Sequence, residues 1–246
     1  MINNSEILVK MSNVHKSFGS NQVLQEVSLE LCRGENLVVI GKSGSGKSVL
    51  IKCLVRLINH DSGSIEVLNH NIQALTEKQL DALRTKIGFL FQGSALYDSM
   101  TVEENMGFAM QRLNKKIQGA ELNKLIEEAL DNVGLKYTGK LMPSELSGGM
   151  KKRVALARTI IMKPEIILYD EPTTGLDPVT SREISRLIVD LQGRYQMSAI
   201  IITHDMSCAK ITANRMMALI NGINYATGSY DSLSKNPDLL VHSFFE

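Results

Sequence analysis

The sequence feature that most constrains the fold is a glycine-rich stretch, GKSGSGKS, at residues 41–48. It fits the pattern G-x-x-x-x-G-K-[ST], in which glycines let successive backbone N–H groups turn toward one cluster of oxygen atoms. An apolar run typical of a short buried strand precedes it at residues 37–40, and apolar residues at helical spacing follow at residues 49–56. A strand, this loop and the positive end of a helix together predict a site for the phosphates of a nucleotide.

Two side chains of this loop have specific expected roles. Lys47 is expected to reach the β- and γ-phosphates, and the Ser48 hydroxyl is expected to bind Mg²⁺. The alternative is a chance match in a turn rich in Gly and Ser, but the strand and helix on either side favour phosphate binding. The loop residues expected to contact the nucleotide are Gly41, Ser43, Gly44, Ser45, Gly46, Lys47, Ser48 and Val49.

Length and composition exclude several other classes of protein. The 246 residues are enough for one α/β domain with an inserted subdomain, and a net charge of +1 gives no basic excess that would favour nucleic acid. The three cysteines are far apart, without the spacing of a zinc site. No apolar run is long enough to cross a bilayer, and the polar start is not a signal peptide. We therefore expect a cytoplasmic chain, held at the inner membrane only by a partner.

Apolar runs and turn residues outline two sheets. Short strands that predict a small antiparallel sheet beside the nucleotide core lie at residues 7–18, 25–32 and 64–68. Further core strands, mostly apolar and separated by helices, lie at residues 87–91, 166–170 and 199–203. Such an alternation predicts a parallel sheet covered on both faces. The pair Asn221-Gly222 within residues 216–226 predicts a hairpin that closes the domain.

Helical patterns fill the intervening segments. Helices are expected at residues 76–84, at 121–133 with Gly134 just past the end, and at 178–191 closed by Gly193. Thr101 and Glu104 form a capping-box start for another helix. Residues 94–162 are therefore interpreted as a helical insertion between two core strands, within a domain that spans residues 7–228 and precedes a tail at 229–246.

Polar side chains fall at or just past the carboxyl ends of the strands, which is the edge where open α/β sheets bind ligands. These residues are Ser48, Gln92, Asp170, Glu171 and His204. Taken alone, each has a structural explanation, since a lone His or Gln after a strand is usually not catalytic. Together they converge on one edge of one sheet, next to the phosphate loop.

Phosphoryl-transfer chemistry, which depends on positioning and charge neutralisation, suggests a role for each residue. Asp170 would hold Mg²⁺ with Ser48, directly or through water. Glu171 would orient and polarise the attacking water as the general base. His204 would donate a hydrogen bond to the γ-phosphate, and Gln92 would contact the metal or the water.

A second glycine-containing segment, LSGGM at residues 146–150, precedes a basic helix at residues 151–162. Ser147, Gly148 and Gly149 form another helix N-terminus suited to an anion. The same residues could simply cap the helix, because Ser is a good N-cap residue. This segment lies in the helical insertion, so the sequence does not assign it to the same nucleotide.

The order of these motifs resembles the ATP-binding cassette (ABC) ATPases. The phosphate loop, Gln92, the LSGGM segment, the strand ending at Asp170 and Glu171, the Leu176-Asp177 turn and His204 follow one another as in that family. The similarity covers residues 7–228. It implies an α/β fold with a P-loop NTPase (RecA-like) core, an N-terminal antiparallel β subdomain and an inserted α-helical signature subdomain.

The resemblance also implies ATP and Mg²⁺ as cofactors and a head-to-tail dimer of two copies of the chain. In such a dimer Ser147, Gly148 and Gly149 would face the γ-phosphate bound by the other subunit, and Asp177 would cross the interface. Phe18, for which the sequence alone leaves adenine stacking and an ordinary core position equally open, is similar to the family's stacking aromatic. Phe18 departs from the commoner Tyr, and Met150 stands where most cassettes carry Gln.

Residues 146–158 and 91–97 are similar to the ATPases of MCE-type phospholipid transporters, a class that includes the bacterial system for maintenance of outer-membrane lipid asymmetry. This resemblance implies transmembrane permease subunits and an MCE-type substrate-binding protein as partners. Ala95, Leu96, Tyr97 and Met100 would either contact a permease helix or fill the insertion's own core. The apolar tail would pack on a partner subunit or on its own domain.

The same residues allow other functions to be compared with a lipid transporter ATPase. An amino-acid, metal or lipoprotein transporter would use a similar cassette. A soluble ABC protein of DNA repair or translation generally carries a long coiled coil, a zinc module or a second cassette, and none is predicted here. A small-molecule kinase would explain residues 41–48 but would leave Ser147 and His204 without a role.

Overall fold

The computed structural model describes residues 6–113 and 117–246, and a six-stranded sheet forms the centre of this part. Across the sheet lie β10 (Ile223–Gly228), β9 (Arg215–Ile220), β3 (Asn36–Ile40), β8 (Ser198–Thr203), β7 (Ile166–Asp170) and β6 (Ile87–Leu90). Neighbouring strands pair in parallel except β10, which runs antiparallel to β9. The predicted parallel core sheet is confirmed.

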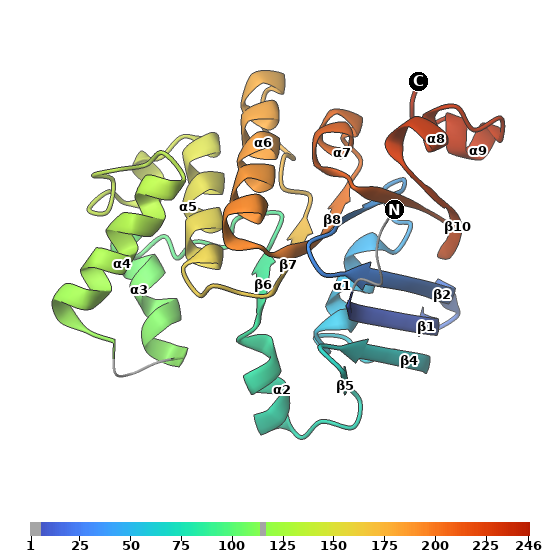
Figure 1. Ribbon diagram of the computed structural model, residues 1–246, viewed down its shortest axis with the longest axis horizontal. Coiled ribbons are helices and arrows are strands. Elements are labelled where there is room, and N and C mark those ends of the chain that lie inside the picture. Colours follow the sequence, from blue (N-terminus) through green and yellow to red (C-terminus); the bar gives the residue numbers. More distant parts are fainter. Residues whose placement is uncertain (1–5, 114–116) are drawn as a thin grey trace.

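Both faces of this sheet are covered. Successive side chains of a strand point to opposite faces, so Leu37 and Val39 join one apolar core whereas Val38 and Ile40 join the other. The first core contains α1 (Lys47–Leu54), and the second contains α6 (Pro178–Tyr195) and α7 (Met206–Thr212), on the opposite side in Figure 1. Every residue of β3, β7 and β8 is buried, which explains why these segments are continuous apolar runs.

A second, antiparallel sheet packs beside α1 (Figure 1). Its order is β2 (Asn21–Cys32), β1 (Ile7–Phe18), β4 (Ser62–Val67) and β5 (His70–Asn71). A two-residue turn with Gly19 in the left-handed region joins β1 to β2, as its Gly-Ser-Asn sequence predicts. This hairpin carries Phe18 at the end of β1.

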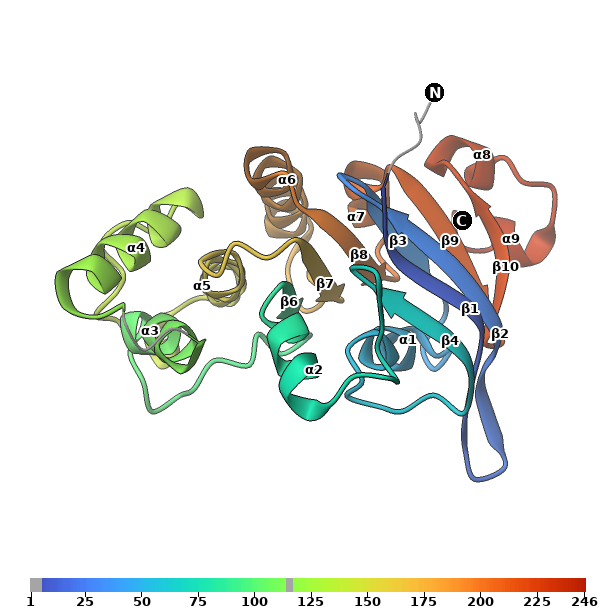
Figure 2. The same cartoon turned by 60° about the horizontal axis from the view of Figure 1, so that its bottom comes forward.

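Helices occupy the segment between β6 and β7. They are α3 (Val102–Leu113), α4 (Gly119–Asn132), the short 3₁₀ turn η1 (Pro143–Glu145) and α5 (Gly148–Ile160). The Thr101 hydroxyl accepts from the Glu104 N–H, and a Glu104 carboxylate oxygen accepts from the Thr101 N–H, so the predicted capping box is confirmed. Figure 2 shows α3, α4 and α5 set apart from the antiparallel sheet. α2 (Glu77–Arg84), capped by Thr76, connects the antiparallel sheet to β6.

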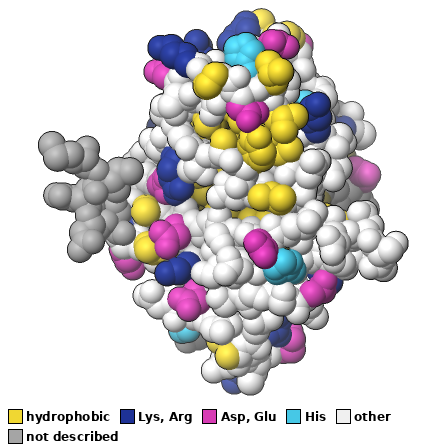
Figure 3. All heavy atoms as spheres, turned by 90° about the vertical axis from the view of Figure 1, so that its right-hand side faces the viewer, with side chains coloured by type: hydrophobic (Ala, Val, Ile, Leu, Met, Phe, Trp, Pro, Cys, Tyr) yellow, Lys and Arg dark blue, Asp and Glu magenta, His cyan; other side chains and the backbone are white. Residues whose placement is uncertain are grey.

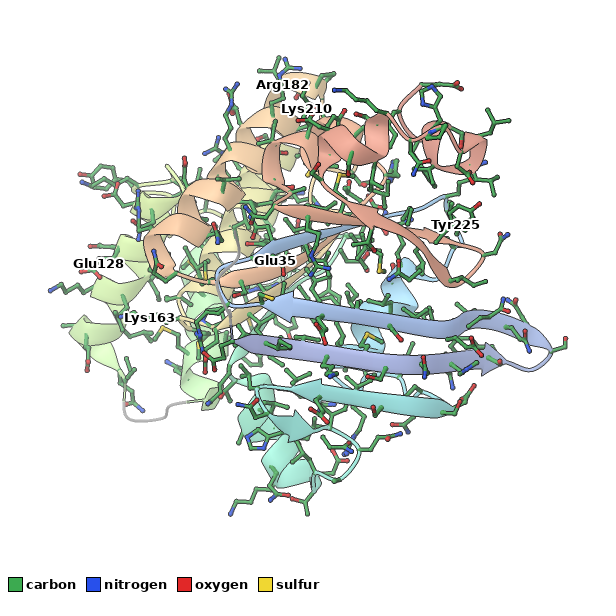
Figure 4. The ribbon with its side chains drawn as sticks, turned by 45° about the vertical axis from the view of Figure 1, so that its right-hand side comes forward. Glu35, Glu128, Lys163, Arg182, Lys210 and Tyr225 are labelled. Carbon is green, nitrogen blue, oxygen red and sulfur yellow. The ribbon has the colours of Figure 1, made fainter. Side chains whose placement is uncertain are left out.

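The chain ends in a hairpin and two short helices. Asn221 and Gly222, both with positive φ, form the predicted turn between β9 and β10. Val241 of α9 (Leu239–His242) and Leu233 of α8 (Tyr230–Ser234) are buried in the apolar core that contains α6 and α7. The tail therefore packs on its own domain, and Tyr225 of β10, marked in Figure 4, donates a hydrogen bond to Asp238 beside α9.

Part of this tail is exposed apolar surface. The face in Figure 3 shows gathered apolar side chains, and on α9 Leu239 and Leu240 are 81% and 50% exposed. Burial of Val241 next to them shows that the short helix presents one side to the core and the other outward.

The predicted end of α6 is wrong. Gly193 was expected to close this helix after residue 191, but the helix continues to Tyr195 and ends where Gln196 adopts a left-handed conformation, with φ of 53°. Among the described residues, and apart from the helix's own backbone and the two neighbours of Gly193, no atom lies within 4 Å of the position a Gly193 Cβ would take, so no steric contact requires glycine there. Gln196 takes the place of the C-terminal glycine, because its own N–H still bonds back to the Gln192 carbonyl.

Candidate functional site

A cavity of about 600 Å³ opens beside the N-terminus of α1. Most residues predicted to form the nucleotide site line it: Phe18, Ser43, Gly44, Gly46, Lys47, Ser48, Val49, Gln92, Glu171 and His204. Asp170 is joined to this set by a hydrogen bond from the Ser48 hydroxyl, and Gly41 by one from Lys47. The side chains at the strand ends therefore do meet beside the phosphate loop.

The phosphate loop needs glycine at two close approaches of the backbone. A Cβ at Gly41 would lie 2.4 Å from the Ser45 Oγ and 2.6 Å from the Leu219 carbonyl oxygen. Gly46 caps α1 with φ of 99°, and a Cβ there would lie 2.7 Å from the Val23 carbonyl oxygen. The buried Ser45 hydroxyl has no hydrogen-bond partner within residues 6–113 and 117–246. Together with the helix N-terminus, this loop fits a phosphate group.

Lys47 lies over the loop as a buried cation. Its Nζ donates to the carbonyl oxygens of Gly41 and Lys42, at 2.7 Å and 3.1 Å, and lies 3.9 Å from a Glu171 carboxylate oxygen. Burial lowers the pKa of Lys47, while the carboxylates of Glu171 and Asp170 oppose that shift. The ammonium group is thus held where it can bind phosphate oxygens.

Ser48 and Asp170 provide oxygen ligands suited to a hard cation. The Ser48 Oγ donates to the Asp170 Oδ1 at 2.9 Å. Burial raises the pKa of Asp170, and the Ser48 hydrogen bond and the positive charges of Lys52 and Lys47 oppose this shift. Within the described ranges no cluster of three or more His, Cys, Asp or Glu side chains could hold a metal. One carboxylate and one hydroxyl fit Mg²⁺, which usually keeps several waters and also binds substrate phosphates.

Glu171 is held in a constrained geometry beside His204. Its backbone has φ of 53°, uncommon for a residue other than glycine, and its N–H donates to the Ile202 carbonyl at 3.0 Å. The carboxylate oxygen Oε2 lies 2.9 Å from the His204 Nδ1 and accepts from the Thr174 hydroxyl at 3.2 Å. Sequence reasoning missed Thr174, whose only signal is its place three residues after Glu171.

Basic side chains of α5 hold the loop that contains Gln92. The Lys152 ammonium donates to the Gln92 carbonyl oxygen, and the Arg158 guanidinium donates to the carbonyls of Ser94 and Ala95, each at 2.8 Å. Ser94 and Ala95 both have positive φ, so the backbone here is neither helical nor extended, and the carbonyls of both residues accept from Arg158. Lys152 is 5% exposed, and burial lowers its pKa. Sequence reasoning did not predict these contacts, because a basic helix face is usually solvated.

The LSGGM segment lies at the start of α5, outside this cavity. The Ser147 hydroxyl accepts from the Met150 N–H at 3.2 Å, so it is an N-cap. A Cβ at Gly149 would lie 2.7 Å from the Thr180 side chain of α6, whose N-cap is Asp177. Ser147, Gly148, Gly149 and Asp177 therefore lie near the starts of two adjacent helices and do not line the cavity of their own chain.

Apolar side chains near the Gln92 loop divide between surface and core. Tyr97 is 47% exposed and contacts Phe108 of α3 edge to face, with ring centroids 5.3 Å apart. Leu96, in contrast, packs against the apolar core that contains α6 and α7. The Asn105 side chain accepts from the Tyr97 N–H and donates to its carbonyl, which fixes the loop at this point.

The fold and the site define a class of protein: the chain is an ABC ATPase. The profile of the ABC transporter family matches residues 24–174, more than half of the chain, and the chain belongs to this family.

Among solved structures, the chain is similar to the dimeric ATP-binding cassette MJ0796 in a post-hydrolysis state with ADP and phosphate. The TM-score is 0.82 and the identity 30%, over 90% of this chain and 98% of the other. It is also similar to cbiO1 from Clostridium perfringens, part of the ABC transporter complex cbiONQ. In that comparison the TM-score is 0.84 and the identity 26%, over 98% of this chain and all of that one.

Curated relatives carry different transport names. A probable ribonucleotide transport ATP-binding protein, mkl, of Mycobacterium leprae is 35% identical over 97% of this chain and 68% of its own length. The methionine import ATP-binding protein MetN of Clostridium tetani is 37% identical over 87% of this chain and 67% of its own. The chloroplastic protein trigalactosyldiacylglycerol 3 of Arabidopsis thaliana is 35% identical over 98% of this chain and 74% of its own. The chain is thus an ATP-binding, ATP-hydrolysing subunit of an ABC transporter. The names of these relatives point to different substrates.

Proposed function

We propose that this chain is the ATPase of a membrane phospholipid transporter and hydrolyses MgATP in the cavity beside α1. The observation that carries the ATPase mechanism is the meeting of Lys47, the Ser48–Asp170 pair and the Glu171–His204 pair around one phosphate loop. In this proposal the phosphate loop and α1 bind the triphosphate, and Phe18 stacks on the adenine.

Glu171 is the general base of the proposed mechanism. Its carboxylate is fixed by Thr174 and His204, so it can accept a proton from the attacking water without first reorienting. His204 would donate to the γ-phosphate, and Lys47 would neutralise charge that develops on the phosphoryl oxygens. Mg²⁺, held by Ser48 and Asp170 with Gln92 nearby, would supply further charge neutralisation when bound.

We further propose that two copies of the chain bind ATP between them, head to tail. The N-terminus of α5, with Ser147, Gly148 and Gly149, does not line its own chain's cavity, which supports a role toward the nucleotide of a second copy. Asp177, at the start of the adjacent α6, would lie at the interface. The likeness to a dimeric cassette supports the same arrangement.

The proposed membrane partner is a pair of permease subunits. No helix among the described residues has the length and apolarity to cross a bilayer. The exposed Tyr97–Phe108 pair, next to the loop that contains Gln92, offers an apolar contact for a permease helix. An MCE-type substrate-binding protein would complete the complex, which would place this chain on the cytoplasmic side of the inner membrane.

Phospholipid is the substrate we favour because residues 146–158 and 91–97 resemble MCE-type ATPases. One relative is named after a galactolipid, trigalactosyldiacylglycerol, and this name supports a lipid. The second candidate is a small polar substrate, since other relatives are named for methionine import or ribonucleotide transport.

The substrate proposal is tested on the transporter purified intact from membranes with this chain tagged. Mass spectrometry of the bound small molecules should find phospholipid at a constant ratio to the permease, above the level in an unrelated membrane complex purified in the same detergent. Recovery of methionine or a nucleotide in place of enriched phospholipid would contradict the lipid assignment while leaving the ATPase mechanism intact.

A further inference from the structure

The end of β1 places a cation against the aromatic ring expected to bind adenine. Lys16 and Phe18 are two positions apart on the strand, so their side chains share one face of the sheet. The Lys16 Nζ lies 5.2 Å from the centroid of the Phe18 ring, within the range of a cation–π contact. Lys16 is largely buried, with its side chain 14% exposed, whereas Phe18 is 50% exposed and lines the cavity.

Asp61, just before β4, holds this end of β1 in place. Its Oδ1 accepts from the Lys16 Nζ at 2.7 Å, and its Oδ2 accepts from the Ser17 N–H at 2.6 Å. The Asp61 N–H in turn donates to the His15 carbonyl oxygen at 2.9 Å. Hydrogen bonding from Lys16 lowers the pKa of Asp61, so the carboxylate stays charged at neutral pH. The carboxylate thus fixes Lys16 and Ser17, and the backbone N–H of the same residue fixes His15, so Asp61 holds all three residues that precede the ring.

We infer that Lys16, held by Asp61, is a positioning residue that orients the Phe18 ring for the purine base of the nucleotide. The ammonium group occupies one side of the ring, which leaves the opposite side for stacking. Phe lacks a hydroxyl, so the ring has no hydrogen bond of its own to fix its tilt. Lys16 supplies this orientation without touching the nucleotide, and the inference rests on the proposed function, in which Phe18 stacks on adenine.

The test compares two ligands that share a polyphosphate but differ in the base. Titration calorimetry on the full chain measures the Kd of MgATP and of magnesium tripolyphosphate. For Lys16→Met, which keeps a side chain of similar length without the charge, we expect the Kd of MgATP to rise roughly three- to tenfold. The Kd of tripolyphosphate should not change, because that ligand has no base to stack.

A matched control lies on the same strand. Lys10 of β1 pairs with Glu30 of β2 at 3.6 Å, and both side chains are about half exposed. Lys10→Met should leave the Kd of both ligands unchanged and should have a melting temperature close to that of the original chain. Lys16→Arg, unlike Lys16→Met, should bind MgATP with the Kd of the original chain, because a guanidinium can both pair with Asp61 and stack on an aromatic ring.

Phe18→Ala separates failure of this inference from failure of the proposed stacking. If Phe18→Ala weakens MgATP binding and Lys16→Met does not, the positioning role of Lys16 is wrong and the stacking role stands. If Phe18→Ala leaves MgATP binding unchanged, both are wrong. Weakened tripolyphosphate binding in Lys16→Met would also overturn the inference, because it would indicate general damage to the phosphate loop. In the Phe18→Ala background, Lys16→Met should cause no further loss.

Discussion

At the scale of single residues, hydrogen bonds and an ion pair hold the buried side chains of Lys47 and Glu171 in fixed positions in the site. Lys47 and Glu171 are both less than 10% exposed, and each is hydrogen bonded to groups of its own chain. Buried charges are costly unless they are paired, so these contacts stabilise the charged forms that phosphoryl transfer needs. The left-handed backbone of Glu171 is a further cost of this arrangement.

Replacement of Glu171 by Gln should slow ATP hydrolysis at least ~100-fold while ATP still binds, because the amide cannot accept a proton from water. Phosphate release measures the turnover, and calorimetry measures the Kd of ATP. Glu165→Gln, just before β7 where Glu165 pairs with Arg33 and Lys86, is the control and should keep near-normal turnover. Normal turnover in Glu171→Gln would remove this residue from its proposed role.

At the scale of elements, helix α6 contains a glycine that its packing does not require. Gly193 lies inside the helix with open space around its Cβ position. Gly193→Ala should raise the free energy of unfolding by about 0.5–1 kcal/mol, because alanine loses less backbone entropy on folding. Urea unfolding followed by circular dichroism checks this value.

Gly34 provides the comparison for that substitution, since its Cβ position is equally open but its φ is 75°. Gly34→Ala should instead lower the free energy of unfolding by about 1 kcal/mol, because alanine is strained in the left-handed region. Equal effects of the two substitutions would show that open space, and not backbone conformation, decides the outcome.

The elements themselves were largely predictable, because strand and helix periods are local signals. The buried runs of β3, β7 and β8 and the N-caps Thr101 and Ser147 lie where the sequence predicts them. The convergence of polar residues at the strand ends was predictable too, since parallel strands share one carboxyl edge.

Contacts between distant segments were not predictable from those local signals. The Lys16–Asp61 pair joins positions 45 residues apart, and the Lys152–Gln92 contact joins positions 60 apart. Nothing in the sequence distinguishes these lysines from solvated ones. The end of α6 was mispredicted for a related reason: glycine is only a frequent C-terminal residue of helices, and Gln196 adopts the same left-handed conformation.

At the scale of the whole molecule, the proposed dimer makes a prediction about two serines. Ser43 lines the nucleotide cavity and Ser147 caps α5, so in a head-to-tail pair each Ser43 should face the other copy's Ser147. With Cys32 replaced by Ser, the Ser43→Cys, Ser147→Cys double variant should form crosslinked dimers on oxidation, more of them with ATP. The native Cys53 and Cys208 are buried.

Each single cysteine variant is the control and should give far less crosslinked product on a denaturing gel. Absence of joined polypeptides in the double variant, even with ATP and the slow Glu171→Gln substitution, would contradict the head-to-tail arrangement. Such a result would leave the cavity of the single chain as the only proposed ATP contact.

The contacts from α5 to residues 92–95 have a mechanical consequence. Helix α5, capped by Ser147, carries Lys152 and Arg158, which donate hydrogen bonds to backbone carbonyls of that loop. A displacement of the N-terminus of α5 would therefore also displace residues 92–95, and with them Tyr97, because these hydrogen bonds connect the helix to the loop. In the proposed head-to-tail dimer, where Ser147 faces the nucleotide of the second copy, movement of that contact would reach the surface beside Tyr97 through these hydrogen bonds.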